Sequence, residues 1–176
     1  MVEPVVSNAG PLMILAKLNL LHLLKQLYGR VLFTEEVYRE VIAEGMRWGY
    51  ADAYVLHQFL EQEGWRAVFV ESLPAIVATA PLDRGEQESI ALAASTNALL
   101  LIDEEDGRKV ARHAGVTVRG TLDVLIEAYK RGLIQRSQLR SYFAEIEQRT
   151  DIWISPALCR RLLQETIGAV DETDRA

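Results

Sequence analysis

The stretch Leu99-Leu100-Leu101-Ile102-Asp103-Glu104-Glu105-Asp106-Gly107-Arg108 decides the expected fold. Its four consecutive apolar residues are too few for a helix and show no polar alternation, which predicts a strand buried on both faces in a parallel sheet. Asp103 follows this strand directly, and residues 107–114 show a helical pattern. Because ligands of open α/β sheets bind at the carboxyl ends of the strands, the position of Asp103 makes it a candidate site residue.

The rest of the chain alternates short apolar runs with helical patterns, which predicts an α/β fold with helices on both faces of the parallel sheet. Further strands are predicted at residues 3–7, 31–33, 65–70 and 116–118, and residues 72–81 are predicted as a loop. Helices are predicted at residues 12–18, 20–28, 35–44, 51–63, 84–94 and 120–132.

After residue 135 the pattern becomes purely helical, with helical spacing around Leu139 and Phe143 and a Ser155-Pro156 start for a helix over residues 157–166. The sequence therefore predicts an α/β domain over residues 1–134. A helical extension over residues 135–170 is expected to pack on the same domain, and residues 171–176 form a polar tail.

Composition limits the possible classes of protein. With 176 residues, 49% of them hydrophobic, the chain can bury a sizeable core. The single cysteine, Cys159, excludes an internal disulfide, and no Cys/His spacing indicates a zinc site. A formal net charge of -6 argues against a protein that coats nucleic acid non-specifically, but it suits an enzyme that holds cations with carboxylates. No signal peptide and no apolar run near the roughly 20 residues of a membrane span are present, so we expect a cytoplasmic protein.

Four polar residues fall at matching places in this layout. Asn8 follows the first strand, Glu40 lies on the helix after the second, Glu86 lies in the first turn of a helix, and Asp103 follows the central strand. Three carboxylates brought together at one sheet edge raise each other's pKa unless a counter-charge is present. Oxygen ligands without His or Cys select hard ions such as Mg²⁺ or Mn²⁺, which also bind phosphate and activate water.

Each of these residues also has a purely structural interpretation. Asp103 could cap the helix that follows it, Glu86 could form a capping box with Asp83, Asn8 could be an N-cap, and Glu40 could be solvated. The coincidence of four such residues at equivalent positions favours a site. Three basic residues after Asp103 could bind an RNA backbone or only balance the neighbouring acids. They are Arg108, Lys109 and Arg112.

The motifs together resemble those of the PIN-domain family, in a prokaryotic subgroup related to VapC-type toxins. They are residues 5–12, 37–41, 85–93 and 101–111, followed by Gly120-Thr121-Leu122 and Trp153-Ile154-Ser155. The resemblance covers nearly the whole chain. It implies a three-layer α/β/α fold with a helical C-terminal addition and metal-dependent endoribonuclease activity. For a toxin it further implies RNA as substrate, a small antitoxin partner and a homodimer.

The resemblance also assigns the acidic positions of the family. The first falls on Asn8, the second on Glu40, the third on Glu86 and the fourth on Asp103. Two further acids, Glu104 and Asp106, are candidate auxiliary ligands. The expected ion, Mg²⁺ or Mn²⁺, would be held by Glu86 and Asp103 with help from Asn8, while Glu40 would orient or deprotonate water.

Asn8 departs from the family pattern, because an amide brings no charge and cannot act as a base. Metal affinity should therefore be lower than in a site with an acid at this position. The alternative is a catalytically weak or inactive PIN-like module that binds RNA or protein.

Overall fold

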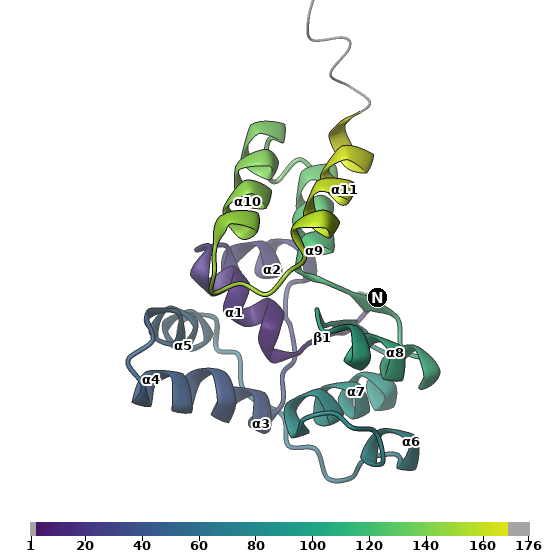
Figure 1. Ribbon diagram of the computed structural model, residues 1–176. Helices are drawn as coiled ribbons and strands as arrows, with labels where there is room; N and C mark the ends of the chain where they lie inside the picture. Colours follow the sequence, from purple (N-terminus) through teal and green to yellow (C-terminus); the bar gives the residue numbers. More distant parts are fainter. Residues whose placement is uncertain (1–2, 169–176) are drawn as a thin grey trace, which may run out of the picture. The chain divides into compact units, whose positions relative to one another are not determined.

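The computed structural model describes residues 3–168, which form two compact units (Figure 1). The first unit ends at Thr121 and the second begins at Leu122. The first unit contains the sheet and the four residues of the predicted site.

The sheet of the first unit is parallel, as predicted. Its strands are β1 (Val5–Ser7), β2 (Leu99–Leu101) and β3 (Val118–Arg119), in the order β1-β2-β3. In the register of the sheet, Leu100 lies opposite Val6 on one side and Val118 on the other. All residues of β2 are buried, which confirms the expectation of a central strand covered on both faces.

Two predicted strands contribute only single bridges. Leu32 pairs with Val6, and Val68 pairs with Thr34, both in parallel orientation. Leu32 bonds through its N–H and its C=O to Val5 and Ser7, and Val68 bonds in the same way to Phe33 and Glu35, but the flanking residues do not continue the ladder. The chain leaves the sheet directly after Thr34 because this residue caps the next helix, with its hydroxyl accepting from the Val37 N–H at 3.2 Å. The strand predicted at residues 116–118 is shifted and covers Val118–Arg119.

The helices of the first unit largely follow the predicted positions. They are α1 (Ala9–Lys17), α2 (Leu21–Tyr28), α3 (Glu35–Tyr38), the π-helix η1 (Arg39–Glu44), α4 (Gly45–Arg47), α5 (Ala51–Glu63), α6 (Ala75–Ala78), α7 (Arg84–Thr96) and α8 (Glu105–His113). Two differences concern their regularity. The helix predicted at residues 35–44 contains a π-helical segment and continues to Arg47, and the predicted loop at residues 72–81 contains the short helix α6. Val77 explains α6, because its side chain is fully buried in the core.

Helix α7 packs against β1 and β2, and α8 packs against α7 and β3. Small and branched side chains of α7, among them Ile90 and Ala93, allow close contact with the sheet. The cluster that they join consists of Val6, Val77, Ile90, Leu92, Ala93, Ala98, Leu100, Ile102, Ala111 and Val116. This core fixes the ends of β1 and β2 and the start of α7, where the predicted site residues lie.

The second unit is helical, as predicted for the C-terminal addition. Helix α9 (Thr121–Lys130) begins at the last residue of the first unit, and α10 (Arg136–Gln148) packs with α11 (Pro156–Ile167). The Arg136 side chain donates to the Ile167 carbonyl at 2.8 Å, which ties the ends of α10 and α11 together. The predicted boundary after residue 134 stays a prediction, and residues 171–176 lie outside the described residues. None of the described helices has the length and apolar composition that crossing a bilayer requires.

Candidate active site

Asn8 and Asp103 leave neighbouring strands at the same edge of the sheet. The Asn8 N–H donates to the Leu101 carbonyl at 2.9 Å, and the Ile102 N–H donates to the Arg119 carbonyl at 2.8 Å. These bonds extend the parallel ladder by one residue beyond β1 and β2. The predicted meeting of Asn8 and Asp103 at one edge therefore follows from the backbone itself.

Asp103 is fixed by Thr121. Its Oδ1 accepts from the Thr121 N–H at 2.8 Å and its Oδ2 from the Thr121 hydroxyl at 2.7 Å. Thr121 is the first residue of α9, so Asp103 satisfies a free N–H of that helix and not of α8, whose N-cap is Glu104. Each carboxylate oxygen accepts more than one bond, so this arrangement leaves Asp103 able to bind a cation.

The electrostatic surroundings of Asp103 disfavour its charge. Burial is the largest cause that raises the pKa of Asp103, to about 6; the hydrogen bonds of Thr121 oppose it, and the charge of Glu104 adds to it. The positive charge of Arg108 lowers this pKa. A cation bound at Asp103 would remove the cost of the buried charge.

Glycine lets two carboxylates approach the start of α1. A Cβ atom placed on Gly10 would lie 3.5 Å from Asp103 Oδ2 and 3.5 Å from Glu104 Oε1. The two acids after β2 therefore lie together, beside the helix that follows Asn8. Of the two candidate auxiliary acids, which the sequence alone did not distinguish, Glu104 is the one that lies next to Asp103 in the candidate site.

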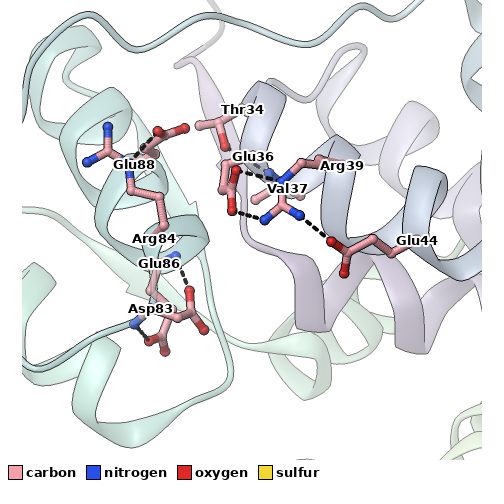
Figure 2. A network of polar contacts seen from close by, with 9 residues as sticks. All are labelled: Thr34, Glu36, Val37, Arg39, Glu44, Asp83, Arg84, Glu86 and Glu88. Atoms are coloured by element: carbon pink, nitrogen blue, oxygen red, sulfur yellow. Dashed lines mark hydrogen bonds and ion pairs between the residues drawn. The ribbon is translucent and has the colours of Figure 1, made fainter.

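Glu86 forms the capping box that was its structural interpretation, and its second carboxylate oxygen points toward Gly107. The Glu86 N–H donates to Asp83 Oδ1 at 2.8 Å, and the Asp83 N–H donates to Glu86 Oε2 at 3.2 Å (Figure 2), which forms the predicted capping box at the start of α7. The other oxygen, Oε1, would lie 3.0 Å from a Cβ on Gly107. Burial and the charge of Asp83 raise the pKa of Glu86 to about 7.

Glu40 reaches the same region from the π-helix η1. Its Oε2 would lie 3.0 Å from a Cβ on Gly85, the residue before Glu86. Partial burial, followed by the charges of Asp83, Glu36 and Glu104, raises the pKa of Glu40 to about 7. Since the residue as a whole is exposed, water screens part of this effect.

The neighbouring Arg39 does not neutralise Glu40. Its guanidinium donates to the carboxylates of Glu36 and Glu44 (Figure 2). These two acids precede and follow Glu40 in the sequence. Among residues 3–168, no ion pair involves Glu40 itself. This carboxylate is therefore available to a cation or to a proton.

The charge of Glu104 raises the pKa of Glu40, of Glu86 and of Asp103 alike. The three predicted acids thus share one electrostatic environment although they come from three separate segments. All donors are oxygens, a set that fits Mg²⁺ or Mn²⁺. Within the described part of the chain, however, no three His, Cys, Asp or Glu side chains are close enough to form a complete metal-ligand group.

Asn8 does not act as a side-chain cap. Although it occupies the N-cap position of α1, its side chain makes no bond to that helix. Its Oδ1 instead accepts from the Ser89 hydroxyl at 3.3 Å, and both residues are buried. Sequence reasoning missed Ser89 and Thr121 as partners of the site, because the pairs are far apart in the chain; a polar residue on the packed face of α7 was the only sign of Ser89.

The structure leaves one predicted ligand and two predicted RNA contacts outside this group. Asp106 has a side chain that is 82% exposed and pairs with Lys109 at 3.2 Å. Arg112 is exposed and lies 4.0 Å from Glu105. These contacts match the alternative in which the basic residues balance neighbouring acids. Arg108 differs, because its Nη1 donates to the Ile102 carbonyl at 2.9 Å and lies beside Asp103.

The first unit is thus an α/β domain with helices packed on a parallel sheet, and Asn8 and Asp103 lie at the carboxyl ends of two neighbouring strands. The family model DUF3368, a PIN domain, matches residues 4–167, and the chain therefore belongs to the PIN domain family. No curated protein and no solved structure matches the chain. PIN domains are generally nucleases and typically use divalent metal ions, which agrees with the oxygen donors described above.

Proposed function

We propose that this protein is an endoribonuclease that hydrolyses RNA phosphodiester bonds with Mg²⁺ or Mn²⁺. The observation that carries the proposal is the gathering of Glu40, Glu86 and Asp103 around Glu104, with a pKa raised in each of the three. Perturbed carboxylates from separate segments of a chain are typical of active sites. Membership of the PIN domain family supports the same activity.

Asp103 and Glu104, which lie together beside Gly10, would hold the ion. Glu86 would join them by a movement of its side chain, because no three acidic side chains of the described residues form a complete ligand group as they stand. When bound, the ion supplies positive charge that stabilises the phosphate during attack by water. Glu40 accepts the proton of the attacking water, since a base with a pKa about 7 is well suited to neutral pH. The 3′ oxygen leaves, so the products carry 5′-phosphate and 3′-hydroxyl ends.

The proposal includes a role as the toxin of a VapC-like toxin–antitoxin pair, with a small protein antitoxin and a homodimer. Support comes from the motifs and from exposed aromatic residues. Trp48 is 71% exposed, Tyr50 58% and Tyr54 49%, all within or beside α4 and the start of α5. Exposed aromatic side chains are enriched in protein interfaces. Light scattering of the purified chain, alone and with a co-expressed small partner, tests these two associations.

Cleavage of RNA by the purified chain is the direct test. With Mg²⁺ or Mn²⁺ we expect single-stranded RNA to be cut to fragments with 5′-phosphate ends, and EDTA should stop the reaction. Asp103→Asn and Glu86→Gln should each lower the rate by about 100-fold or more, since both remove a charged ligand. Glu105→Gln is the matched control, because Glu105 is an exposed acid on the same segment that lies outside the group. Intact RNA with both ions, together with no Mn²⁺ binding by calorimetry, would contradict the proposal.

The second candidate is a PIN-like module without catalysis, which is favoured by the amide at position 8. Asn8→Asp separates the two functions. If the site binds a cation, a fourth carboxylate should raise Mn²⁺ affinity at least about tenfold, because hard ions favour charged oxygen ligands. Gln58→Glu, on the exposed face of α5, adds the same charge elsewhere and should change nothing. Equal Mn²⁺ affinity of Asn8→Asp and wild type, measured by calorimetry, would favour the binding module.

A further inference from the structure

Arg108 is a basic side chain that lies directly beside Asp103. Its Nη1 donates to the Ile102 carbonyl at 2.9 Å, at the carboxyl end of β2. A Cβ atom on Gly120 would lie 2.8 Å from Asp103 Oδ1 and 3.0 Å from the same Nη1, so the glycine leaves room for both groups at one place. The positive charge of Arg108 also lowers the pKa of Asp103. The backbone carbonyl therefore holds the guanidinium next to an acid that we propose as a metal ligand.

Neighbouring basic side chains are paired with carboxylates, whereas Arg108 is not. Lys109, the next residue, pairs with Asp106 at 3.2 Å. Arg84, at the start of α7, pairs with Glu88 at 2.7 Å. Within residues 3–168 the Arg108 guanidinium makes no ion pair, and its single hydrogen bond is the one to the backbone carbonyl. A guanidinium has more N–H donors than this one bond uses, and the side chain is partly exposed, so donors remain available to a ligand.

A phosphate group fits these donors. The planar guanidinium stays charged at neutral pH, and its N–H groups match the spacing of two phosphate oxygens. The acids of the candidate site carry negative charge, which repels an RNA backbone. A cation without an acidic partner offsets this repulsion at the point where the phosphate has to approach the metal ion.

We propose that Arg108 binds a phosphate group of the RNA beside Asp103, and that Lys109 and Arg112 take no part in this contact. The inference rests on the proposed ribonuclease function and names the residue that recognises the charged part of the substrate. Arg108 touches substrate and does not hold the ion. The Ile102 carbonyl positions it, because one N–H of the guanidinium is anchored there.

The test compares Arg108→Gln with wild type. Fluorescence anisotropy measures binding of a labelled single-stranded RNA over a range of salt concentrations at saturating Ca²⁺, which takes oxygen ligands. We expect RNA affinity to fall about tenfold or more, as for the loss of a hydrogen bond between two charged groups. The slope of log affinity against log salt should become less steep by about 0.7, the value for one phosphate contact on a single strand. Calorimetry should show no loss of Mn²⁺ affinity, because Arg108 repels a cation.

Two further variants separate a specific contact from general attraction. Arg108→Lys keeps the charge, so the salt dependence should stay close to that of wild type, while RNA affinity should fall about threefold because lysine lacks the planar fork. Lys109→Gln is the matched control, because it removes the same charge from the next residue, whose side chain is paired with Asp106. It should change RNA affinity by less than about twofold.

Wild-type RNA affinity and salt dependence in Arg108→Gln would overturn the inference, as would an equal loss of RNA affinity in Lys109→Gln. A tenfold loss of Mn²⁺ affinity in Arg108→Gln would overturn it too, because Arg108 would then act by holding Asp103 in place. If circular dichroism shows that Arg108→Gln does not fold, Arg108→Lys decides, and unchanged RNA affinity would count against the contact.

The ribonuclease proposal survives each of these results as long as wild type binds Mn²⁺ and cleaves RNA. Wild type that does neither would overturn the proposed function and this inference together.

Discussion

Gly10 and Gly107 sit at the starts of two helices, and both lie against carboxylates of the site. A Cβ on Gly107 would lie 2.6 Å from Ile102 Cδ1 and 3.0 Å from Glu86 Oε1, whereas a Cβ on Gly10 would meet nothing closer than 3.5 Å. Ile102 is fully buried in the core and has little room to move. The two glycines thus differ in whether a methyl group fits.

Alanine at the two positions should have opposite effects on stability. Gly107→Ala should lower the free energy of unfolding by about 1–3 kcal/mol, the usual cost of overpacking. Gly10→Ala should raise it by up to about 1 kcal/mol, because alanine favours a helix over glycine. Urea unfolding followed by circular dichroism measures both. If both substitutions changed the free energy of unfolding in the same direction, the space around these two glycines would not be what decides the effect of alanine.

At the scale of single elements, Asp83 at the start of α7 has two effects: it caps the helix, and its charge raises the pKa of nearby acids. Asp83 caps the helix, and its charge is the second largest cause of the raised pKa of both Glu40 and Glu86. The cap needs only an oxygen acceptor at this position, whereas the effect on the pKa needs a charge. An amide at position 83 therefore separates the two contributions.

Asp83→Asn should leave helix α7 intact and lower the pKa of Glu40 and of Glu86. Asparagine caps as well as aspartate, so stability should change by less than about 0.5 kcal/mol. The pKa of Glu40 and of Glu86 should fall below 7 toward the ordinary 4.5, as measured by NMR titration of the carboxyl carbons. Asp52→Asn, in the first turn of α5, is the control and should move neither pKa. Unchanged values in Asp83→Asn would show that the charge of Asp83 does not contribute to the raised pKa of either residue.

The π-helix η1 separates Glu36 and Glu40, which a regular helix would place on one face. In a regular helix, Glu36 and Glu40 would share a face, because they are four residues apart. In the structure Glu36 binds Arg39, while Glu40 turns toward Gly85 at the start of α7. Arg39 also reaches Glu44, five residues on, a spacing that matches the wider turn of a π-helix. Arg39 is thus bound by Glu36 and Glu44, and the Glu40 carboxylate points toward the candidate site.

For the whole molecule, the raised pKa values predict how stability depends on pH. Glu86 binds its proton with a pKa about 7 in the folded state and near the ordinary 4.5 when unfolded, and Asp103 is shifted in the same direction. Between these values the folded state holds more protons than the unfolded state. Its stability must therefore fall as the pH rises through this window.

We expect the metal-free protein to lose on the order of 1–3 kcal/mol of stability between pH 5 and pH 8 from this cause. Mn²⁺ should restore most of the loss at pH 8, because it compensates the carboxylates. Glu86→Gln should flatten the profile, whereas Glu61→Gln, an exposed acid paired with Arg66, should leave it unchanged. Urea unfolding in EDTA and in Mn²⁺ gives the profiles. A stability that rises with pH over this range would contradict the expectation.

Much of the architecture could be predicted because it rests on local pattern. The apolar run before Asp103 indicated β2, the Asp83 cap indicated the start of α7, and alternating strands and helices indicated a parallel sheet. The same reasoning placed Asn8 and Asp103 at one edge. Residues 31–33 and 65–70 were predicted too long, because a strand also needs a partner that continues beside it, and here each segment pairs at one residue.

The sequence by itself determined the class of fold and which acids could reach the sheet edge, since hydrophobic burial and helix capping act through neighbours in the chain. Only the tertiary structure decided what each side chain does there. Thr121 binds Asp103 from 18 residues away and Ser89 binds Asn8 from 81, while Asp106 turns to solvent. The physical reason is that a side chain's direction depends on the packing of elements that are distant in sequence, and no local pattern records that packing.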